Sequence, residues 1–371
     1  MKIGIDARLW NETGVGRYMR ALINHLQLLD TQNNYVVFMR PREFESVKFQ
    51  NSRWAKQLAS VRWHTLHEQL EMPKLYRTAN LDLLHIPYFS VPLATPQPFV
   101  VTIHDLIISN FATGKATTLP YPLYQFKRFG YSFVLSQAVK RAAKIITVSE
   151  TVKQDIVREF AISPHKILVT YEAGELEVSS DRSTFPLPKK YILYVGNAHP
   201  HKNLNRLIEA FSLARRRVPN LFLVVIGKHD YFYTRLQTEV AKSEIAASVL
   251  FPGEVTNAAL KRWYMHASAF VFPSLAEGFG IPGLEAMQFN CPVIASDIPV
   301  FREVYGSAAS YFDQTDVLDM ADEITSVVTR IKLRQALITL GKTQVKKYSW
   351  KKMADSTLAL YESCALLRSP Q

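Results

Sequence analysis

The most informative part of this 371-residue sequence is the segment Pro273-Ser-Leu-Ala-Glu277-Gly-Phe-Gly-Ile-Pro282-Gly-Leu-Glu285. It follows an apolar run of strand length, residues 269–273, and leads into a helical pattern over residues 282–289. Because proline suits the first helical position, we expect Glu277 in the loop and Glu285 in the first turn of the helix. The unpaired N–H groups at this end of the helix predict a site for phosphate oxygens.

Three glycines in this segment lack side chains that would keep a bulky anionic ligand away from the backbone: Gly278, Gly280 and Gly283. One carboxylate can then accept hydrogen bonds from a sugar, and the other from a ribose near a diphosphate. Two other interpretations stay open. The glycines form only a tight turn, or their spacing is a dinucleotide fingerprint with Glu303 as the ribose acceptor. Pro282 inside the fingerprint and Glu277 directly before it weigh against the latter.

Apolar runs of strand length alternate with helical patterns on both sides of this segment, which is typical of parallel α/β sheets. The expected strands are residues 2–6, 35–39, 81–86, 99–103 and 144–148, followed by 191–195, 221–226, 269–273 and 292–295. Helices are expected over residues 204–216, 233–243 and 282–289, and a helical tail over 317–367 with a break near Tyr348. The polar, proline-containing stretch 173–190 predicts a linker. Two Rossmann-like domains, residues 1–172 and 191–349, with a cleft between them are the most economical architecture.

Length and composition fit a two-domain enzyme. With 48% hydrophobic and 20% charged residues, the chain is neither a small stapled module nor a disordered protein. Its two cysteines, Cys291 and Cys364, cannot form a disulfide framework, which favours a reducing compartment. We see no secretory signal and no apolar run of the ~20 residues that a membrane helix requires, so we expect a cytoplasmic protein. The net charge of +12 favours anionic partners: nucleotides, nucleic acid or acidic lipid.

Segment 273–285 resembles the E-x7-E signature of the retaining, group-1 (family 4) glycosyltransferases, with Glu277 and Glu285 as the two carboxylates. The similarity extends to residues 251–255, 260–264, 269–274 and 285–287, and Asn290 stands where relatives usually carry glycine. The resemblance implies the GT-B fold, which has two Rossmann-like domains with parallel sheets facing across a cleft. It also implies transfer of a hexosyl or deoxyhexosyl unit from a nucleotide diphosphate sugar to a hydroxyl acceptor, without a cofactor. By similarity to bacterial polysaccharide mannosyltransferases, mannose from a guanosine donor is preferred over a uridine diphosphate sugar.

The same resemblance assigns roles to this segment. Glu277 is expected to bind hydroxyls of the donor sugar, and Glu285 the nucleotide ribose. The backbone around the sugar and diphosphate is expected from Gly278, Phe279, Gly280, Ile281, Pro282 and Gly283.

A second candidate segment, residues 196–204, lies between an expected strand and helix. Lys202 can neutralise a diphosphate as a compact point charge, although a solvated lysine near a helix start is the alternative. Relatives commonly place an arginine five residues before this lysine or directly before it, where this chain has Asn197 and His201. The positive charge of that arginine is then supplied by a protonated His201 or by an arginine elsewhere in the chain, or the activity is weaker than is typical of the relatives. A metal site at His199 and His201 is disfavoured because no third ligand is evident.

His104 and Asp105 follow the strand expected at residues 99–103, at the end where α/β sheets place ligands. The family resemblance supports His104 at the transferred sugar, and the alternative is a core histidine with Asp105 capping a turn. After the first strand, Gly14 and Gly16 would let the backbone approach the donor, with Arg17 facing phosphate or acceptor. A plain turn is the alternative there.

Residues 121–131 interleave aromatic and basic side chains, which suits an anionic membrane surface or an acceptor groove. Stacking on nucleic acid is conceivable, but no recognised nucleic-acid module accompanies the stretch. As partners, the family resemblance implies a nucleotide sugar donor and a glycan or lipid-linked glycan acceptor used in cell-surface polysaccharide biosynthesis. We also expect peripheral contact with the inner face of the plasma membrane, no nucleic acid, and a C-terminal helix over 350–371 that packs on the first domain.

The chemistry expected of these residues is electrostatic. As the anomeric bond stretches, negative charge grows on the diphosphate, and Lys202 and the helix start at Ile281 gain interaction energy. The family resemblance implies same-face attack in which the leaving phosphate takes the acceptor's proton, and this is preferred over a covalent intermediate because no second carboxylate is clearly placed as a nucleophile. The chain has no Asp-x-Asp, so we expect no metal. A nucleotide-sugar epimerase of the same architecture and a non-catalytic basic binding protein remain as alternatives.

Overall fold

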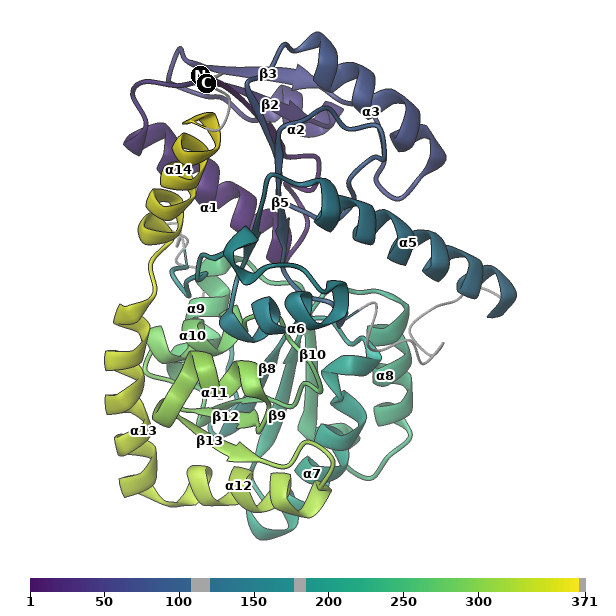
Figure 1. Cartoon of the computed structure of the whole chain (residues 1–371). Coiled ribbons are helices and arrows are strands. Elements are labelled where there is room, and N and C mark those ends of the chain that lie inside the picture. The colour runs from purple at the N-terminus through teal and green to yellow at the C-terminus, as the bar shows by residue number, and fades with distance from the viewer. Residues whose placement is uncertain (108–120, 177–184, 367–371) are drawn as a thin grey trace. The chain divides into compact units, whose positions relative to one another are not determined.

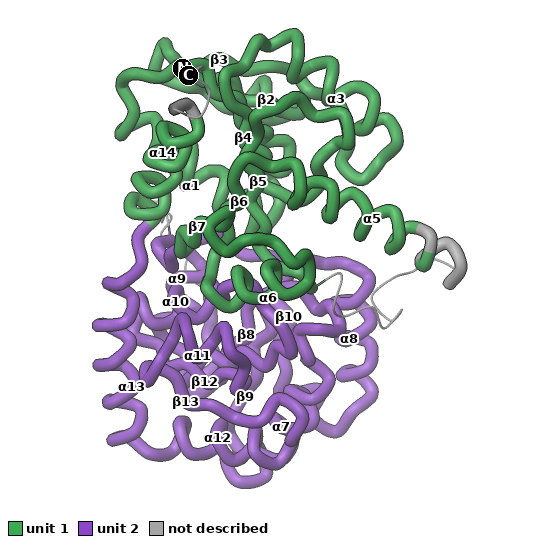
Figure 2. The backbone as a smooth tube through the Cα atoms, in the orientation of Figure 1, with its two compact units in different colours: residues 1–110, 117–172, 350–371 green, residues 111–116, 173–349 purple. Residues whose placement is uncertain are grey.

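The computed structural model describes residues 1–107, 121–176 and 185–366, which divide into two compact units (Figures 1 and 2). The first unit holds the described residues up to Glu172, together with the described residues from Trp350 onward. The second unit holds Ala173–Ser349.

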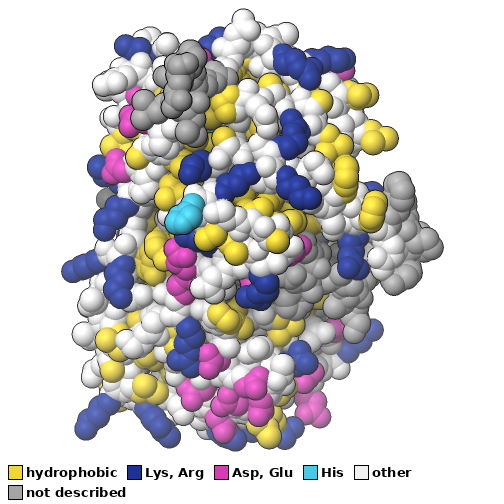
Figure 3. Space-filling model, viewed as in Figure 1, with side chains coloured by type: hydrophobic (Ala, Val, Ile, Leu, Met, Phe, Trp, Pro, Cys, Tyr) yellow, Lys and Arg dark blue, Asp and Glu magenta, His cyan; other side chains and the backbone are white. Residues whose placement is uncertain are grey.

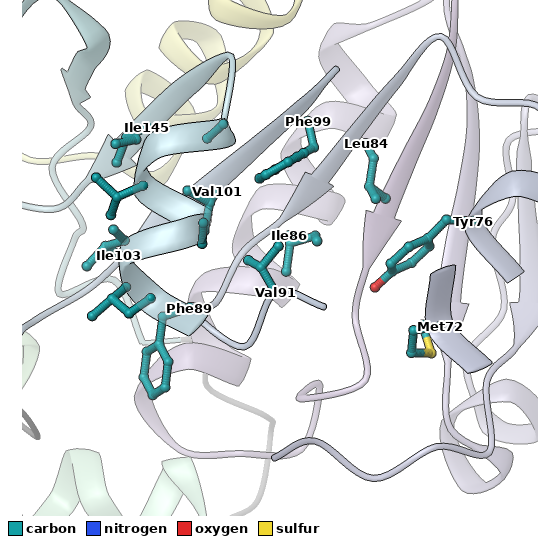
Figure 4. Close-up of a cluster of buried hydrophobic side chains, with 14 of the residues drawn as sticks. Met72, Tyr76, Leu84, Ile86, Phe89, Val91, Phe99, Val101, Ile103 and Ile145 are labelled. Atoms are coloured by element: carbon teal, nitrogen blue, oxygen red, sulfur yellow. The ribbon is translucent and has the colours of Figure 1, made fainter. Parts of the chain in front are cut away.

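The first unit is built on a seven-stranded parallel sheet with the strand order β3-β2-β1-β4-β5-β6-β7. Its strands are β1 (Lys2–Asp6), β2 (Asn34–Met39), β3 (Trp54–Leu58), β4 (Leu83–Ile86), β5 (Phe99–Ile103), β6 (Lys144–Thr147) and β7 (Ile167–Val169). Its helices are α1 (Gly14–Leu29), α2 (Pro41–Ser46), α3 (Leu66–Thr78), α5 (Tyr121–Arg141), α6 (Glu150–Phe160) and α14 (Trp350–Leu366). Figure 4 shows side chains of β4, β5, β6 and α3 converging in the buried core of this unit.

Local sequence explains where these elements begin and how they pack. Tyr18, Leu22 and Leu26 recur at helical spacing on α1 and are fully buried, so one face of the helix covers the sheet. The Thr65 side chain accepts a hydrogen bond from the Glu68 amide and so caps α3. Ser149 caps α6 in the same way through the Val152 amide.

The C-terminal helix α14 packs against α1 and β4. Its Tyr361 hydroxyl forms a hydrogen bond with Nδ1 of His85, whose Nε2 lies 2.8 Å from the Thr102 hydroxyl. Burial lowers the pKa of His85 to about 3, so this histidine is neutral at neutral pH. A buried neutral ring with a partner on each nitrogen therefore anchors α14 to the sheet.

The second unit is built on a six-stranded parallel sheet with the strand order β10-β9-β8-β11-β12-β13. Its strands are β8 (Tyr191–Val195), β9 (Phe222–Ile226), β10 (Val249–Gly253), β11 (Ala269–Phe272), β12 (Val293–Ser296) and β13 (Ala309–Phe312). Its α-helices are α7 (Leu204–Arg217), α8 (Tyr231–Ala241), α9 (Asn257–His266), α10 (Ile281–Gln288), α11 (Pro299–Tyr305), α12 (Val317–Thr329) and α13 (Ile331–Gln344). Both sheets place their first strand next to the point where the strand order reverses, which is the Rossmann-like arrangement.

The predicted fold of two Rossmann-like parallel α/β units is confirmed, and every predicted strand is present. The strands that the sequence did not indicate are β3, β7, β10 and β13, which are the outer strands of the two sheets. An outer strand is paired on one side and more exposed, so it needs no continuous apolar run. Trp54–Leu58 has only its first residue buried, and β10 contains Pro252 and an irregular register.

Two further expectations differ from the structure. The helical tail has an additional break at Arg330, which separates α12 from α13. The described ends of the expected linker pack into the second unit: Ala173 is fully buried, and the Phe185 ring lies 5.1 Å from that of Trp263. At Gly174, a Cβ atom would lie 2.6 Å from the Leu284 carbonyl carbon, so the chain approaches α10 too closely for a side chain. The polar composition of residues 173–190 predicted a linker and gave no indication of these contacts.

The contact between Tyr361 and His85 predicts a stability effect. Tyr361→Phe leaves the buried Nδ1 of His85 without its partner, and we expect the free energy of unfolding to fall by about 1–3 kcal/mol in urea denaturation. Tyr231→Phe, at a tyrosine with 59% exposure, serves as the matched control and should change stability by less than about 0.5 kcal/mol. Equal stability of the two variants would contradict the anchoring role of the pair.

Candidate active site

The candidate site of the second unit lies where β8 and β11 run side by side. These strands are hydrogen-bonded neighbours, and the strand order of the sheet reverses between them. Parallel α/β sheets bind ligands in the crevice at such a reversal, beyond the carboxyl ends of the strands. The loop after β8 carries Lys202, and the loop after β11 carries Glu277. Sheet topology therefore brings together two sequence segments that were singled out independently.

Lys202 and Glu277 form an ion pair across these two loops. The Lys202 ammonium donates to Oε1 of Glu277 at 2.6 Å, and the Ser274 hydroxyl donates to the same oxygen at 2.7 Å. The side chains are 14% and 11% exposed, respectively. A backbone hydrogen bond from the Leu275 amide to the His201 carbonyl also joins the loops. The sequence placed both charged residues at the site but did not predict their direct contact.

The pair keeps hydrogen-bonding capacity for a ligand. An ammonium group has three N–H donors, and the contact with Glu277 uses one of them. Both contacts to Glu277 reach Oε1, and within the part of the chain that the structure describes no hydrogen bond reaches Oε2. The arrangement can therefore donate to an anion and accept from a hydroxyl at the same place.

His201 is uncharged in this loop. Burial, reinforced by the neighbouring Lys202 cation, lowers the pKa of His201 to about 3. Of the alternatives for a second cation, a protonated His201 is therefore disfavoured at neutral pH. Asn197 shapes the loop instead, since its carbonyl accepts a hydrogen bond from the Tyr194 hydroxyl at 2.7 Å and its side chain accepts one from the His199 amide.

The two histidines of this loop stack with ring centroids 6.0 Å apart. Among the residues that the structure describes, no group of three or more His, Cys, Asp or Glu side chains is arranged to hold a metal ion.

The glycines at the start of α10 have a packing role that the sequence did not indicate. Gly280 adopts a left-handed backbone with φ of 104°, and the Tyr305 hydroxyl donates to its carbonyl at 2.5 Å. A Cβ atom at Gly280 or at Gly283 would overlap the Tyr305 side chain. These two glycines therefore make room for the buried Tyr305, and their predicted role beside a ligand stays a prediction. Tyr305 was not singled out from the sequence because it lies on α11, remote in sequence.

Glu285 lies deeper in α10 than predicted. It is the fifth residue of the helix rather than part of the first turn, is 2% exposed, and accepts a hydrogen bond from the Tyr264 hydroxyl at 2.8 Å. The Phe279 and Ile281 side chains are also buried. Pro282 has no N–H, and the Gly283 amide donates to the Gly280 carbonyl. The amides of Gly280 and Ile281 are thus the donors that the helix start can direct to an anion.

In the first unit, His104 lies just after β5. Its Nδ1 lies 3.3 Å from the Glu172 carboxylate, and its Nε2 lies 3.3 Å from the Pro87 carbonyl oxygen. The Tyr18 ring meets it edge to face at 4.9 Å. Asp105 accepts a hydrogen bond from the Ile107 amide. This contact fits the alternative interpretation, in which Asp105 caps a turn. Glu172 was missed because it lies in a polar stretch without a periodic pattern.

The predicted glycine-containing segment forms the start of α1, four residues or fewer before Tyr18. A Cβ atom at Gly16 would lie 2.5 Å from the Trp10 carbonyl oxygen, whereas no atom lies within 4 Å of the Cβ position of Gly14. Gly14 therefore has open space beside its backbone, and the approach of a ligand there stays a prediction. Arg17 is half-buried in the first turn of the helix. Through Tyr18, this segment lies beside His104.

Comparisons with family models, with curated proteins and with solved structures all lead to glycosyltransferases. Residues 177–344 match the family described as Glycosyl transferases group 1, and residues 13–173 match Glycosyltransferase Family 4. The chain is 34% identical over 269 residues to the O-antigen chain mannosyltransferase RfbU of Salmonella typhimurium, a match that covers 72% of this chain and 70% of the relative. It is 27% identical over 381 residues to O-antigen chain mannosyltransferase B of Escherichia coli, covering 94% and 96%. The structure of sucrose-phosphate synthase from Thermosynechococcus elongatus is similar in fold, with a TM-score of 0.78 at 17% identity over 98% of both chains.

The packing of Tyr305 against α10 predicts different effects of alanine at two glycines. In Gly283→Ala, the new methyl group would lie 2.4 Å from atoms of the Tyr305 ring and hydroxyl and would overlap them. We therefore expect the free energy of unfolding to fall by about 1–3 kcal/mol. Gly14→Ala has open space around the new Cβ atom and should leave stability nearly unchanged. Chemical denaturation followed by fluorescence measures both variants, and a stable Gly283→Ala protein would show that Tyr305 does not occupy this position.

Proposed function

The chain belongs to the group 1 glycosyltransferases, retaining enzymes of the GT-B fold, and we propose that it moves a mannosyl unit from guanosine diphosphate mannose to a hydroxyl of a glycan or lipid-linked glycan. The two O-antigen chain mannosyltransferases that it resembles support both the sugar and a place in cell-surface polysaccharide biosynthesis. The guanosine base is the expectation that accompanies mannose, and other hexosyl donors are the alternative.

The observation that carries the proposal is the ion pair between Lys202 and Glu277 at the reversal of strand order. The unused N–H donors of Lys202 suit the diphosphate of the donor, and Oε2 of Glu277 suits a sugar hydroxyl. Such a pair binds a molecule that carries an anion and hydroxyl groups close together, which describes a nucleotide diphosphate sugar.

Bond cleavage is proposed to be assisted by charge. When the anomeric C–O bond stretches, the leaving diphosphate gains negative charge, and the Lys202 ammonium and the amides of Gly280 and Ile281 interact with it more strongly than with the intact donor. The acceptor hydroxyl attacks the same face of the sugar and passes its proton to the leaving phosphate oxygen. Lys202 and the helix start take the place of a divalent cation in this scheme, so the transfer needs no metal.

The other predicted residues are proposed to bind and orient the donor. Glu285, held by Tyr264, is the proposed acceptor for the nucleotide ribose. His104 is proposed to bind the transferred sugar, with Gly14 allowing close approach of the backbone and Arg17 facing phosphate or acceptor.

Replacement of Glu277 tests this function. We expect Glu277→Gln to lower kcat/KM by about 100-fold or more, because the variant loses the carboxylate that binds the sugar and holds Lys202. The assay follows mannosyl transfer from guanosine diphosphate mannose to octyl α-mannoside by proton NMR, which also reports the retained anomeric configuration, and it is repeated with excess chelator.

The matched control is Glu254→Gln, an exposed carboxylate directly after β10 in the same unit, which should leave transfer unchanged. Normal turnover by Glu277→Gln would contradict the assignment, and loss of activity in chelator would contradict metal independence. Consumption of donor without a mannosylated product would favour an epimerase, and lack of nucleotide binding would favour a non-catalytic binding protein.

We also propose peripheral contact of the first unit with anionic lipid at the inner face of the plasma membrane. Leu66 and Leu70, one turn apart on α3, are 85% and 65% exposed, and Phe129 and Phe133 on α5 are 74% and 48% exposed. Figure 3 shows hydrophobic side chains interspersed with lysine and arginine on this unit. Side chains of residues 121–124 and 126, in the predicted aromatic and basic stretch, lie outside the described part of the structure. No helix in the described ranges combines the length and apolarity needed to cross a bilayer.

Vesicle sedimentation tests this contact. Binding should be stronger to vesicles containing phosphatidylglycerol than to phosphatidylcholine alone. The double substitution Leu66→Ser and Leu70→Ser should weaken binding at least about tenfold, since two apolar side chains no longer enter the lipid interface. Leu318→Ser, at a leucine of the second unit with 61% exposure, is the control. Equal binding of all three proteins would contradict the proposal.

A further inference from the structure

His104 is held by a group that no sequence pattern indicated, the carboxylate of Glu172. Oε1 of Glu172 lies 3.3 Å from Nδ1 of His104, and the two side chains are 6% and 12% exposed. Glu172 is also the last residue of the first unit before the chain enters the second. The pair thus joins the end of β5 to the segment that follows β7.

The burial of Glu172 needs a partner. A carboxylate removed from water is strongly disfavoured unless it is paired with a positive charge or with hydrogen-bond donors. Among the ion pairs of the described residues, His104 is the one partner of Glu172. No lysine or arginine of the described chain forms an ion pair with this carboxylate. The position of Glu172 is therefore explained by the imidazole.

The remaining contacts of His104 restrict the ring further. Nε2 is at hydrogen-bonding distance from the Pro87 carbonyl, and the Tyr18 ring packs edge to face against the imidazole. Burial, with a smaller contribution from the Glu172 charge, raises the pKa of Tyr18 to about 12, so its hydroxyl stays protonated and neutral. An oxygen atom 3.3 Å from each ring nitrogen, together with the Tyr18 ring, restricts the orientation of the imidazole.

We propose that Glu172 is the positioning residue for His104, fixing the orientation of the imidazole and the proton on Nδ1 while His104 itself contacts the transferred sugar. The inference rests on the proposed function for the role of His104, but the pairing stands on the geometry of the first unit alone. Side chains that are held by a second group keep their reactive geometry, and misplacement by about 1 Å can lower a rate by about 100-fold. Glu172 contributes to transfer through this restraint and not through contact with the substrate.

The first experiment examines the pair without any substrate. In the full-length protein with ¹⁵N-labelled histidine, we expect the Nδ1–H signal of His104, assigned through its loss in His104→Gln, to move in Glu172→Gln. Glu175→Gln, at an exposed carboxylate three positions later, should leave that signal in place. An unchanged His104 signal in a folded Glu172→Gln protein overturns the pairing, whatever the enzyme transfers.

The second experiment measures transfer from guanosine diphosphate mannose to octyl α-mannoside. Glu172→Ala should lower kcat about tenfold to a hundredfold with less than about a threefold change in donor KM, and Glu172→Gln, which keeps an oxygen acceptor, should restore part of the rate. In the His104→Ala background, Glu172→Gln should cause no further loss, because the carboxylate acts through the imidazole. An equal loss in both backgrounds overturns the positioning role.

The two experiments separate the possible failures. If the wild-type protein transfers nothing but the His104 signal moves in Glu172→Gln, the proposed function fails and the pairing holds. If transfer occurs and His104→Ala has normal kcat, the positioning role in catalysis is overturned. Should Glu172→Ala fail to fold, Glu172→Gln, which preserves the shape of the side chain, decides both measurements.

Discussion

The parallel pairing of β8 with β11 is the constraint on which the candidate site depends. These strands are separated in the chain by two further strands and their helices, yet they are neighbours in the sheet. Because both run in the same direction, their carboxyl ends meet at one edge, and the loops that follow them converge there. Lys202 and Glu277 lie 75 positions apart in sequence and meet at 2.6 Å for this reason.

The charges of this site are arranged to be held in place while keeping capacity for a ligand. The Glu277 carboxylate balances the positive charge of the Lys202 ammonium. The buried Ser274 hydroxyl donates to the same carboxylate oxygen, Oε1, and so holds it in place. His201 stays neutral beside them because burial and the lysine both oppose its protonation. Lys202 is therefore the charged basic side chain of this loop, since the chain carries asparagine and histidine at positions 197 and 201.

Sequence reasoning was accurate where a residue's role follows from its own neighbours, and inaccurate where it depends on a distant segment. Asn290 shows this for the backbone: it was recognised as a substitute for glycine, and its φ is 61°. For Gly280 and Gly283, the spacing suggested a ligand and even matched a dinucleotide fingerprint, but it did not indicate the side chain that packs against both glycines. Their lack of side chains accommodates Tyr305, whose position no local pattern encodes.

The sequence by itself determined the two parallel α/β units, because strands buried on both faces require continuous apolar runs, and it identified the loops that carry charged residues. It did not reveal the outer strands, which are partly exposed and can be polar or irregular. Only the tertiary structure decided which residues meet: Lys202 with Glu277, and His104 with Glu172. Such contacts depend on strand order and on helix packing, which bring together side chains whose separation in the chain carries no information about their distance in space.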